Sequence, residues 1–317
     1  MSGIGIITNP KARRNLRNPA IAQQLAEILG DCGSVCAPED FDNLHLLTRE
    51  FCERDIDVLC INGGDGTIHA AMTTMVRAYG DKPLPPVALL CGGTMNTIAK
   101  GIGIQGKPLP ILEEVVSTYK QKVDFVTRPR WLMKVDGNRY GFMLGTGVFA
   151  NYLEQYYEGT PSVPWAMWVL ARGVLSAFVG GIHIRRMMRR HHGVARADDE
   201  TWPRTEWAAV AAGTVDQVGL GFSPFYECLE NPGKMHAVGL GSRPVQLVME
   251  LIPAIRHQPL QHPDNFSKVC VSLTLTANEQ VTYMLDGDFY RGKNTLTVEI
   301  GPRVDFIQPF TKPSTST

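Results

Sequence analysis

A glycine-rich segment that contains a carboxylate lies where an apolar run gives way to a helical pattern. Gly63-Gly64-Asp65-Gly66-Thr67 follows residues 58–61, which predict a strand, and leads into a helical pattern over 67–79. Backbone N–H groups and a helix N-terminus can hold an anion there, because glycines let the backbone approach it closely. Thr67 can cap the helix and Asp65 can orient the water shell of a magnesium ion. The segment predicts a phosphate site; the alternative is an ordinary glycine-rich turn.

Two further loops have a similar setting. Gly92-Gly93-Thr94-Met95-Asn96 follows the apolar residues 87–90 and opens a helix predicted over 94–101, and Asn9-Pro10-Lys11 ends the first predicted strand, with Arg13 and Arg14 close behind. In a parallel sheet all three loops fall at the carboxyl edge, where ligands bind. A phosphate there would meet backbone amides from two loops and cationic charge from the third. The alternative for Arg13 and Arg14 is a solvated loop.

A pair of carboxylates occurs late in the chain, at Asp286-Gly287-Asp288. Side chains two apart in an extended segment point to one face, so the two aspartates could share a proton, a metal or a substrate hydroxyl. One would serve as base while the other holds magnesium. The alternative is a plain β-turn, since Asp-Gly is a common turn dipeptide.

The elements that would position these residues differ between the two parts of the chain. Strand and helix patterns alternate at 3–8, 20–29, 58–61, 67–79, 87–90 and 94–101, which predicts a parallel sheet flanked by helices. After Asp124 the segments 131–135, 140–144, 207–212, 269–276, 281–285 and 296–300 read as strands, and 136–138 is a hairpin-turn signal. We therefore predict an α/β domain over 1–127 and a mainly antiparallel β domain over 128–317, whose final strand could return to the first domain.

Composition limits the classes of protein. The 317 residues are 44% hydrophobic, enough for a substantial core, and Lys plus Arg balance Asp plus Glu at 31 each, so bulk charge predicts no nucleic-acid partner. The seven cysteines are scattered without a Cys-x-x-Cys pair, which suits a reducing cytoplasm. The N-terminus shows no basic region followed by an apolar stretch, so we expect no secretory signal.

The three loops, in this order and spacing, resemble the catalytic domain of the diacylglycerol kinase and sphingosine kinase superfamily, which includes soluble bacterial lipid kinases. The similarity runs nearly end to end and implies an NAD-kinase-like α/β domain with a three-layer parallel sheet, followed by an antiparallel β-sandwich that receives the lipid, with ATP between them. In that family Asn-Pro, Gly-Gly-Asp-Gly-Thr and Gly-Thr-x-Asn bind ATP. With Lys11 as the cation of the first loop, the implied ATP-binding residues are Asn9, Pro10, Lys11, Gly63, Gly64, Asp65, Gly66, Thr67, Gly93, Thr94 and Asn96.

The resemblance also implies catalytic roles. The family's β domain ends with Asp-Gly-Glu, whose last carboxylate is taken as the proton acceptor, and Asp286-Gly287-Asp288 stands in that place. The implied catalytic residues are Asp288, Asp286 and Asp65, and the implied cofactors are ATP and Mg²⁺, with Asp65 and Asp286 as metal ligands.

Three departures from the family pattern bear on the metal and the substrate. Thr97 stands where many relatives have Asp, Asp288 replaces Glu, and Asn231-Pro232-Gly233-Lys234 replaces a stretch that supplies a metal site in relatives. They leave open an altered acceptor, a weaker magnesium site, or a relative that binds nucleotide or lipid without catalysis.

One apolar stretch suggests how such a protein reaches its lipid. Residues 163–184 are interrupted by Arg172 and followed by four arginines, so a spanning helix is disfavoured, because an arginine near its middle costs about 2.5–3.5 kcal/mol. Trp165, Trp168 and Arg172 fall near one helical face, which suits an interfacial helix; the alternative is a core helix with a solvated basic end. We expect a cytoplasmic protein peripherally associated with membrane, with a homodimer compatible with the sequence.

The function expected is ATP-dependent phosphorylation of the hydroxyl of diacylglycerol or a related lipid alcohol, with sphingoid base or ceramide as the alternative acceptor. NAD kinases share Gly-Gly-Asp-Gly-Thr and are the nearest rival among enzymes, but Asn96-Thr97 leads to Ile98 here, without the Asp of their second signature. A nucleotide- or lipid-binding protein without catalysis is the rival from another class.

Overall fold

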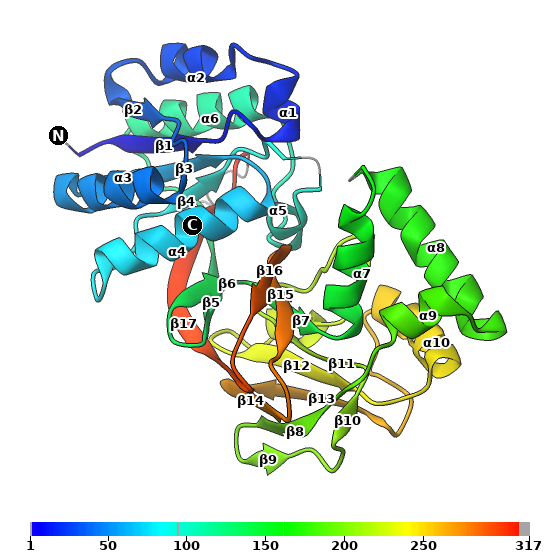
Figure 1. The fold of residues 1–317 in the computed structure, drawn as a ribbon. Coiled ribbons are helices and arrows are strands. Elements are labelled where there is room, and N and C mark those ends of the chain that lie inside the picture. Colours follow the sequence, from blue (N-terminus) through cyan, green and yellow to red (C-terminus); the bar gives the residue numbers. More distant parts are fainter. Residues whose placement is uncertain (1, 94, 161, 311–317) are drawn as a thin grey trace, which may run out of the picture. The chain divides into compact units, whose positions relative to one another are not determined.

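The chain forms two compact units in this computed structural model, which describes residues 2–93, 95–160 and 162–310. Unit 1 comprises the residues up to Arg130 together with those from Pro302 on, and unit 2 comprises Trp131–Gly301 (Figure 1). The long strands β5 (Thr127–Val135) and β17 (Thr295–Ile307) contribute residues to both units.

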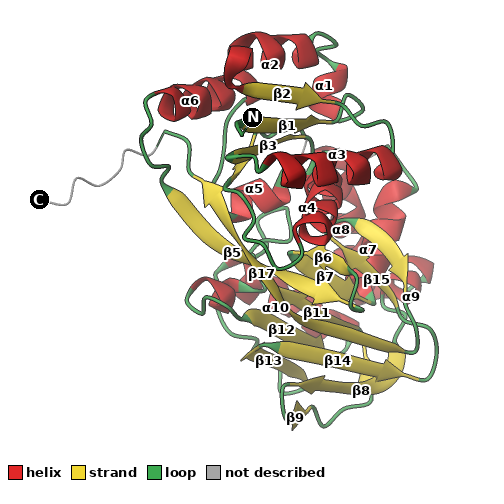
Figure 2. Ribbon diagram, turned by 90° about the vertical axis from the view of Figure 1, so that its left-hand side faces the viewer, coloured by secondary structure: helices red, strands yellow, loops and turns green. Residues whose placement is uncertain are grey.

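Unit 1 is built from alternating strands and helices: β1 (Ile4–Thr8), α1 (Arg13–Leu16), α2 (Ile21–Leu29), a 3₁₀ turn (Gly30–Cys32), β2 (Gly33–Cys36), α3 (Phe41–Arg54), β3 (Val58–Asn62), α4 (Asp65–Tyr79), β4 (Val87–Leu89), α5 (Thr97–Gly101) and α6 (Pro108–Lys120). Its strands run parallel in the order β4-β3-β1-β2, and β17 adds to β4 where Phe306 is paired with Val87. Helices α2 and α6 pack together over one face of the sheet and α3 and α4 over the other (Figures 1 and 2). Every residue of β1, β3 and β4 is buried, as expected for parallel strands covered on both faces.

The described residues of unit 2 form two packed β-sheets and four α-helices. Its elements are β6 (Arg139–Gly141), β7 (Met143–Thr146), α7 (Val148–Tyr157), α8 (Val163–Val179), α9 (Ile182–Met187), β8 (His191–Ala197), β9 (Glu200–Thr201), β10 (Glu206–Trp207), β11 (Ala209–Gly213), a 3₁₀ turn (Tyr226–Leu229), β12 (Met235–Leu240), α10 (Pro244–Ile255), β13 (Asn265–Cys270), β14 (Ser272–Ala277), β15 (Thr282–Leu285) and β16 (Asp288–Arg291). One sheet has the order β10-β8-β14-β17, with β5 beside β17, and the other has the antiparallel order β13-β12-β11-β7-β15-β16.

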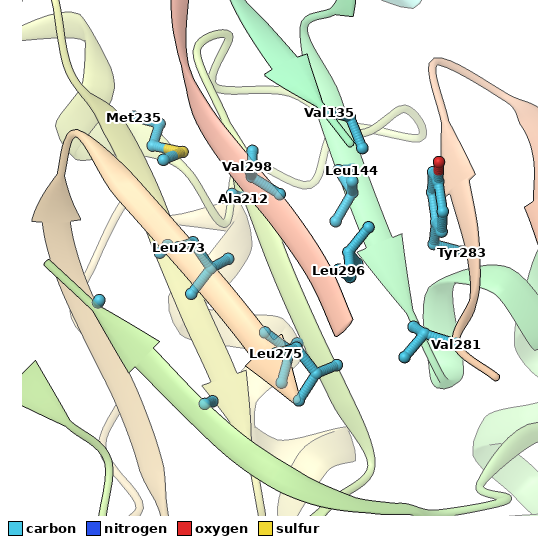
Figure 3. Packing of buried hydrophobic residues seen from close by; sticks show 14 of the residues in the cluster. Val135, Leu144, Ala212, Met235, Leu273, Leu275, Val281, Tyr283, Leu296 and Val298 are labelled. Atoms are coloured by element: carbon cyan, nitrogen blue, oxygen red, sulfur yellow. The ribbon is translucent and has the colours of Figure 1, made fainter. Parts of the chain in front are cut away.

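The core of unit 2 lies between these sheets. Leu273 and Leu275 of β14 and Leu296 and Val298 of β17 belong to the same buried cluster as residues of the second sheet such as Tyr283 (Figure 3). Alternate residues of β14, and of β17 as far as Glu299, are buried and more exposed, the period expected when one face of a strand packs on a core. The expected fold class, an α/β domain followed by an antiparallel β-sandwich, is confirmed.

Several expected boundaries differ from the structure. The strand expected over 140–144 is interrupted at Phe142, and the strand expected over 269–276 is two strands separated by Val271. The apolar stretch 163–184 is not one helix: α8 ends at Val179, and Gly180 and Gly181, with φ of 78° and 114°, separate it from α9. Positive φ is readily available to glycine, so the glycine pair stops α8 there.

Candidate functional site

The glycine-rich loop after β3 leads directly into α4. The helix begins at Asp65, with Gly64 as its N-cap, so the expectation that Thr67 caps it is wrong. Thr67 lies inside the first turn, where its Oγ1 accepts a hydrogen bond of 2.9 Å from Nδ2 of Asn9. A Cβ on Gly63 would collide with the Thr67 side chain, so glycine is required there. The N–H groups of the first turn of α4 have no acceptor within the helix, and the helix dipole adds partial positive charge at this end.

Asn9, at the end of β1, fastens its loop to this turn. Besides the bond to Thr67, its backbone N–H donates to the carbonyl of Asn62 at 2.9 Å, and its Oδ1 accepts from the backbone N–H of Lys11 at 2.9 Å. The buried Asn15 donates to the carbonyl of Asn9 at 2.7 Å. Pro10 and Lys11 are exposed, so the ammonium group of Lys11 is available to an anion near this edge.

Arg13 and Arg14 behave differently. Arg13 is exposed in α1, whereas Nη1 of Arg14 donates to the carbonyls of Cys91 at 2.9 Å and Gly106 at 3.1 Å. Arg14 therefore ties the first loop to the segment after β4.

Asn96 organises the third loop. It adopts φ of 48°, its Oδ1 accepts from the N–H of Gly93 at 3.1 Å, and its Nδ2 donates to the carbonyls of Cys91 at 3.2 Å and Gly93 at 3.1 Å. Thr94, expected to bind nucleotide, lies outside the described residues. A Cβ on Gly93 would collide with Cα of Gly64, so the second and third loops touch backbone to backbone.

Asp65 joins the same two loops through its side chain. Its Oδ2 accepts from the N–H of Thr97 and its Oδ1 from the N–H of Ile98, both at 3.0 Å, so the carboxylate caps the N-terminus of α5. Asp65 thus has a structural task that the sequence did not suggest.

The cysteine thiol beside the third loop is not a nucleophile. Burial raises the pKa of Cys91 to about 11, and the opposing effect of the Arg14 charge is smaller. The thiol therefore stays protonated at neutral pH, and covalent thiolate chemistry is not expected at this edge.

In unit 2 the Asp286-Gly287 pair forms the turn between β15 and β16, where Leu285 is paired with Asp288. Asp286 and Gly287 have φ of 51° and 95°, as in two-residue hairpin turns. The expectation of an extended segment with both aspartates on one face is therefore wrong, because the chain reverses between them.

The two aspartates also differ in surroundings. Asp286 is 2% exposed; its Oδ1 accepts from the N–H of Phe142 and of Met143, each at 2.9 Å, and its Oδ2 lies 3.1 Å from the N–H of Phe142. These bonds fall where the expected strand 140–144 is interrupted. Asp288 opens β16 and is half-buried.

Tyr157 of α7 supports this turn. Its Oη donates to the carbonyl of Gly287 at 3.2 Å, and its ring meets the ring of Phe289 edge-on at 6.1 Å between centroids. The sequence carried no signal for this contact, since 130 residues separate Tyr157 from Gly287.

Asn62 is a second residue that sequence reasoning missed. It is fully buried at the end of β3, and its Nδ2 donates to Oγ1 of Thr8 at 2.9 Å and approaches Oδ1 of Asn15 at 3.4 Å. A polar residue that ends a buried strand was the available signal. With Asn9, these side chains form a hydrogen-bonded polar cluster where β1 and β3 end, next to the first and second loops.

The described residues hold no group of three or more His, Cys, Asp or Glu side chains arranged for a metal ion. In the segment 231–234, Nδ2 of Asn231 donates to the carbonyl of Glu227 at 2.8 Å and Gly233 has φ of 78°. A magnesium ion that enters with nucleotide is held largely by phosphates and water, with one or two carboxylates, and Asp65 is the carboxylate that opens α4 beside the glycine loops. The residues present therefore fit such an ion at unit 1.

Within residues 2–93, 95–160 and 162–310, no helix is both long enough and apolar enough to cross a membrane.

Comparison with known proteins identifies similar sequences. Residues 4–127 match the family model of the diacylglycerol kinase catalytic domain. Probable YegS-like lipid kinases of Yersinia pestis (strain Pestoides F) and Yersinia pseudotuberculosis serotype O:1b (strain IP 31758) are each 25% identical over 250 residues, 78% of this chain and 77% of theirs.

Solved structures share the fold. A diacylglycerol kinase from Bacillus anthracis str. Sterne is 14% identical, with a TM-score of 0.68 over 98% of this chain and 97% of that one. A putative diacylglycerol kinase from the same strain gives a TM-score of 0.70 at 14% identity, over 98% of both chains.

Proposed function

Since the chain belongs to the diacylglycerol kinase catalytic-domain superfamily and is a lipid kinase, we propose that it transfers the γ-phosphoryl group of ATP to the hydroxyl of diacylglycerol or a related lipid alcohol. The observation that carries this proposal is the pair of glycine loops in backbone contact at the N-terminus of α4. Side chains are excluded where the two loops meet, and the helix end supplies N–H donors and positive potential for phosphate oxygens.

The nucleotide would lie along the carboxyl edge of the unit 1 sheet. Lys11 and Arg13 are exposed near the phosphate position and would neutralise phosphate charge. A shallow, open hollow lined by Cys36, Ala37, Pro38, Glu39, Asn43 and Leu47 follows β2 at the same edge of the sheet, and the base would lie over it. Ligands of open parallel sheets bind at this edge.

Magnesium would be held by phosphates and by water oriented by Asp65, and when bound it would supply charge neutralisation at the transferred phosphoryl group. Thr97 contributes its N–H to Asp65, and its side chain is buried. Because Thr97 replaces the second carboxylate of many relatives, Asp65 alone would orient the magnesium-bound water at these loops.

For the acceptor, we assign the general base to Asp288. Its carboxylate would take the proton of the lipid hydroxyl as the new O–P bond forms and ADP leaves with the electrons of the broken P–O bond. Asp286 would act as a positioning residue, because backbone N–H groups occupy both of its oxygens and it is buried. Diacylglycerol is the first choice of acceptor, and sphingoid base or ceramide is the alternative.

The test is an assay with labelled ATP, magnesium and a panel of diacylglycerol, sphingosine and ceramide in mixed micelles, with NAD as a further acceptor. Asp288→Asn should lower kcat at least about 100-fold, since general-base catalysis contributes about 10²–10⁴. Asp199→Asn, a fully exposed aspartate of unit 2, is the matched control and should leave kcat unchanged.

Three results would contradict the proposal. Phosphorylation of NAD alone would identify a soluble nucleotide kinase. ATP binding without turnover on any lipid would favour a binding protein that lacks catalysis. Full activity in Asp288→Asn would remove the assigned base.

A further inference from the structure

The helices of unit 2 expose large apolar side chains along their outer faces. An amphipathic helix on a globular surface normally turns its polar stripe outward. On α8 the outward positions recur at helical spacing and are apolar, with Leu175, Phe178 and Val179 being 66%, 60% and 86% exposed. Helix α10 repeats this pattern, with Met249 66% and Ile252 57% exposed. The full set is Met167, Trp168, Leu175, Phe178, Val179, Ile182, Val245, Met249, Ile252 and Ile255, here termed the apolar helical face.

These helices form one group within unit 2, because α8 contacts α7, α9 and α10 (Figure 1). The inward side of α8 is also apolar or small, and Gly173 packs directly on Met187 of α9. The helix is therefore hydrophobic on nearly all sides, which is typical of a helix covered on both faces. Exposed apolar surface of this extent marks an interaction site.

One tryptophan expected as a membrane anchor is otherwise engaged. Nε1 of Trp165 donates to the carbonyl of Tyr156 at 2.9 Å, and its ring lies against Gly159, so Trp165 serves the interior of unit 2. Trp168 is 56% exposed and remains the available indole.

The chain segment that forms α8 and α9 carries positive charge. Residues 163–190 contain five arginines and no acidic residue. Arg172 donates to Gln155, and Arg190 donates to the carbonyls of Gly241 and Ser242, so these two serve the fold. Arg186 is paired with Glu158. Arg185 and Arg189 are exposed and point to an anionic partner.

Helix α10 has the same charge character. Its acidic residue, Glu250, is buried and accepts from the N–H groups of Gln261 and His262. Arg243 and Arg256 flank the helix and are exposed. A face of exposed apolar side chains with exposed arginines in or next to the same helices is complementary to the interface of an anionic bilayer, where apolar groups enter the acyl boundary and cations meet phosphates.

We propose that the apolar helical face docks this protein on an anionic phospholipid bilayer. The choice of a lipid occupant rests on the proposed function, because a lipid kinase must reach an acceptor that resides in a membrane. A second copy of the chain fits less well, since a two-fold contact through this face would bring its arginines toward one another.

Vesicle flotation tests the proposal without any kinase turnover. Vesicles of phosphatidylcholine with phosphatidylglycerol should carry the wild-type protein, and phosphatidylcholine alone should carry less. The double variants Leu175→Ser/Phe178→Ser and Met249→Ser/Ile252→Ser should each weaken partitioning more than about tenfold. Arg185→Glu/Arg189→Glu should weaken it on anionic vesicles by at least about fivefold per arginine. Leu46→Ser, on α3 of unit 1 and 63% exposed, is the control and should partition like wild type.

Three further measurements distinguish the outcomes. Activity on a short-chain diacylglycerol in nonionic micelles should be unchanged in all these variants, and circular dichroism should show the wild-type fold. Folded variants that still float with anionic vesicles would overturn the proposal. So would a wild-type dimer in size-exclusion chromatography that Leu175→Ser/Phe178→Ser converts to monomer. Flotation that depends on these residues in a protein without kinase activity would support docking and refute the proposed function instead.

Discussion

The buried carboxylate of Asp286, at the turn between β15 and β16, can either position this turn or take part in the reaction. Replacement of Asp286 distinguishes these two roles. Its oxygens accept from the N–H groups of Phe142 and Met143 at 2.9 Å, and Oδ1 alone accepts one bond from each. In Asp286→Asn, the amide oxygen can occupy the Oδ1 position and keep both bonds without the negative charge. Charge-assisted bonds are about twice as strong as neutral ones, so we expect a loss of about 1–2 kcal/mol in the free energy of unfolding.

Asp286→Ala should be much more damaging. It removes both acceptors and leaves two buried N–H groups unpaired, at about 1–3 kcal/mol each. It also places alanine at φ of 51°, which costs about 1–2 kcal/mol where Asn is tolerated. The expected total is about 4 kcal/mol, measured by urea denaturation followed by circular dichroism.

Kinase activity then decides the role of the carboxylate. If Asp286 only positions the turn, Asp286→Asn should keep kcat within about tenfold of wild type, whereas Asp288→Asn should lose at least about 100-fold. Asp286 does more than position the turn if Asp286→Asn, with its unfolding free energy lowered by no more than about 2 kcal/mol, loses as much activity as Asp288→Asn. In that case the carboxylate itself would take part in proton transfer or metal binding.

Three further predictions concern other parts of the molecule. Gly93→Ala should raise KM for ATP about tenfold or more with little effect on KM for lipid, because its Cβ meets the backbone of Gly64; equal changes in both constants in steady-state kinetics would contradict this. Asp65→Ala should lower the free energy of unfolding by about 2–4 kcal/mol, and Asp65→Asn by about half as much, since the carboxylate caps α5; equal urea midpoints for both variants would count against the cap. Burial lowers the pKa of His191 from 6.5 to about 4, so the unfolded chain takes up this proton first. The contribution of neutral His191 to the free energy of unfolding should be fully present above pH 6.5 and should fall by up to about 3 kcal/mol as the pH falls toward 4. The variant His191→Gln should lack this part of the pH dependence in urea titrations.

The parallel half of the fold was readable because its signals are strong. Buried strands such as β1 and β3 are continuous apolar runs, and each is followed by a polar or glycine-rich loop at one edge of the sheet. Strand β2 was missed, since its four residues are only half-buried and carry no apolar run.

Helix α10 was missed for a different reason. Its exposed positions include Val245, Met249, Ile252 and Ile255, whereas its acidic residue Glu250 is buried, so the apolar-inside, polar-outside pattern expected of a surface helix does not apply. Pro244 and Pro253 also argue against a helix, yet Pro244 occupies the first turn, where proline is tolerated, and Pro253 lies in the last turn. The exposed apolar residues that make α10 a candidate for docking are therefore also the reason why the helix was not recognised in the sequence.

The candidate site was only partly readable. The glycine loops and their order along the chain are local features, so they could be predicted from the sequence. The capping of α5 by Asp65 and the support of Gly287 by Tyr157 are contacts across 32 and 130 residues, and they depend on how the elements pack. The geometry of Asp286 required knowing that the chain turns there.

The composition of unit 1 from two distant stretches has a consequence for synthesis on the ribosome. Its first 130 residues emerge early, but the strand that pairs with β4, around Phe306, is made only after all of unit 2. Until then the β4 edge lacks its native neighbour, and an unpaired edge strand invites pairing with other chains. A nascent chain of this protein would therefore need either rapid folding of unit 2 or shielding of that edge by a chaperone. Expression of residues 1–130 alone should yield an aggregation-prone fragment.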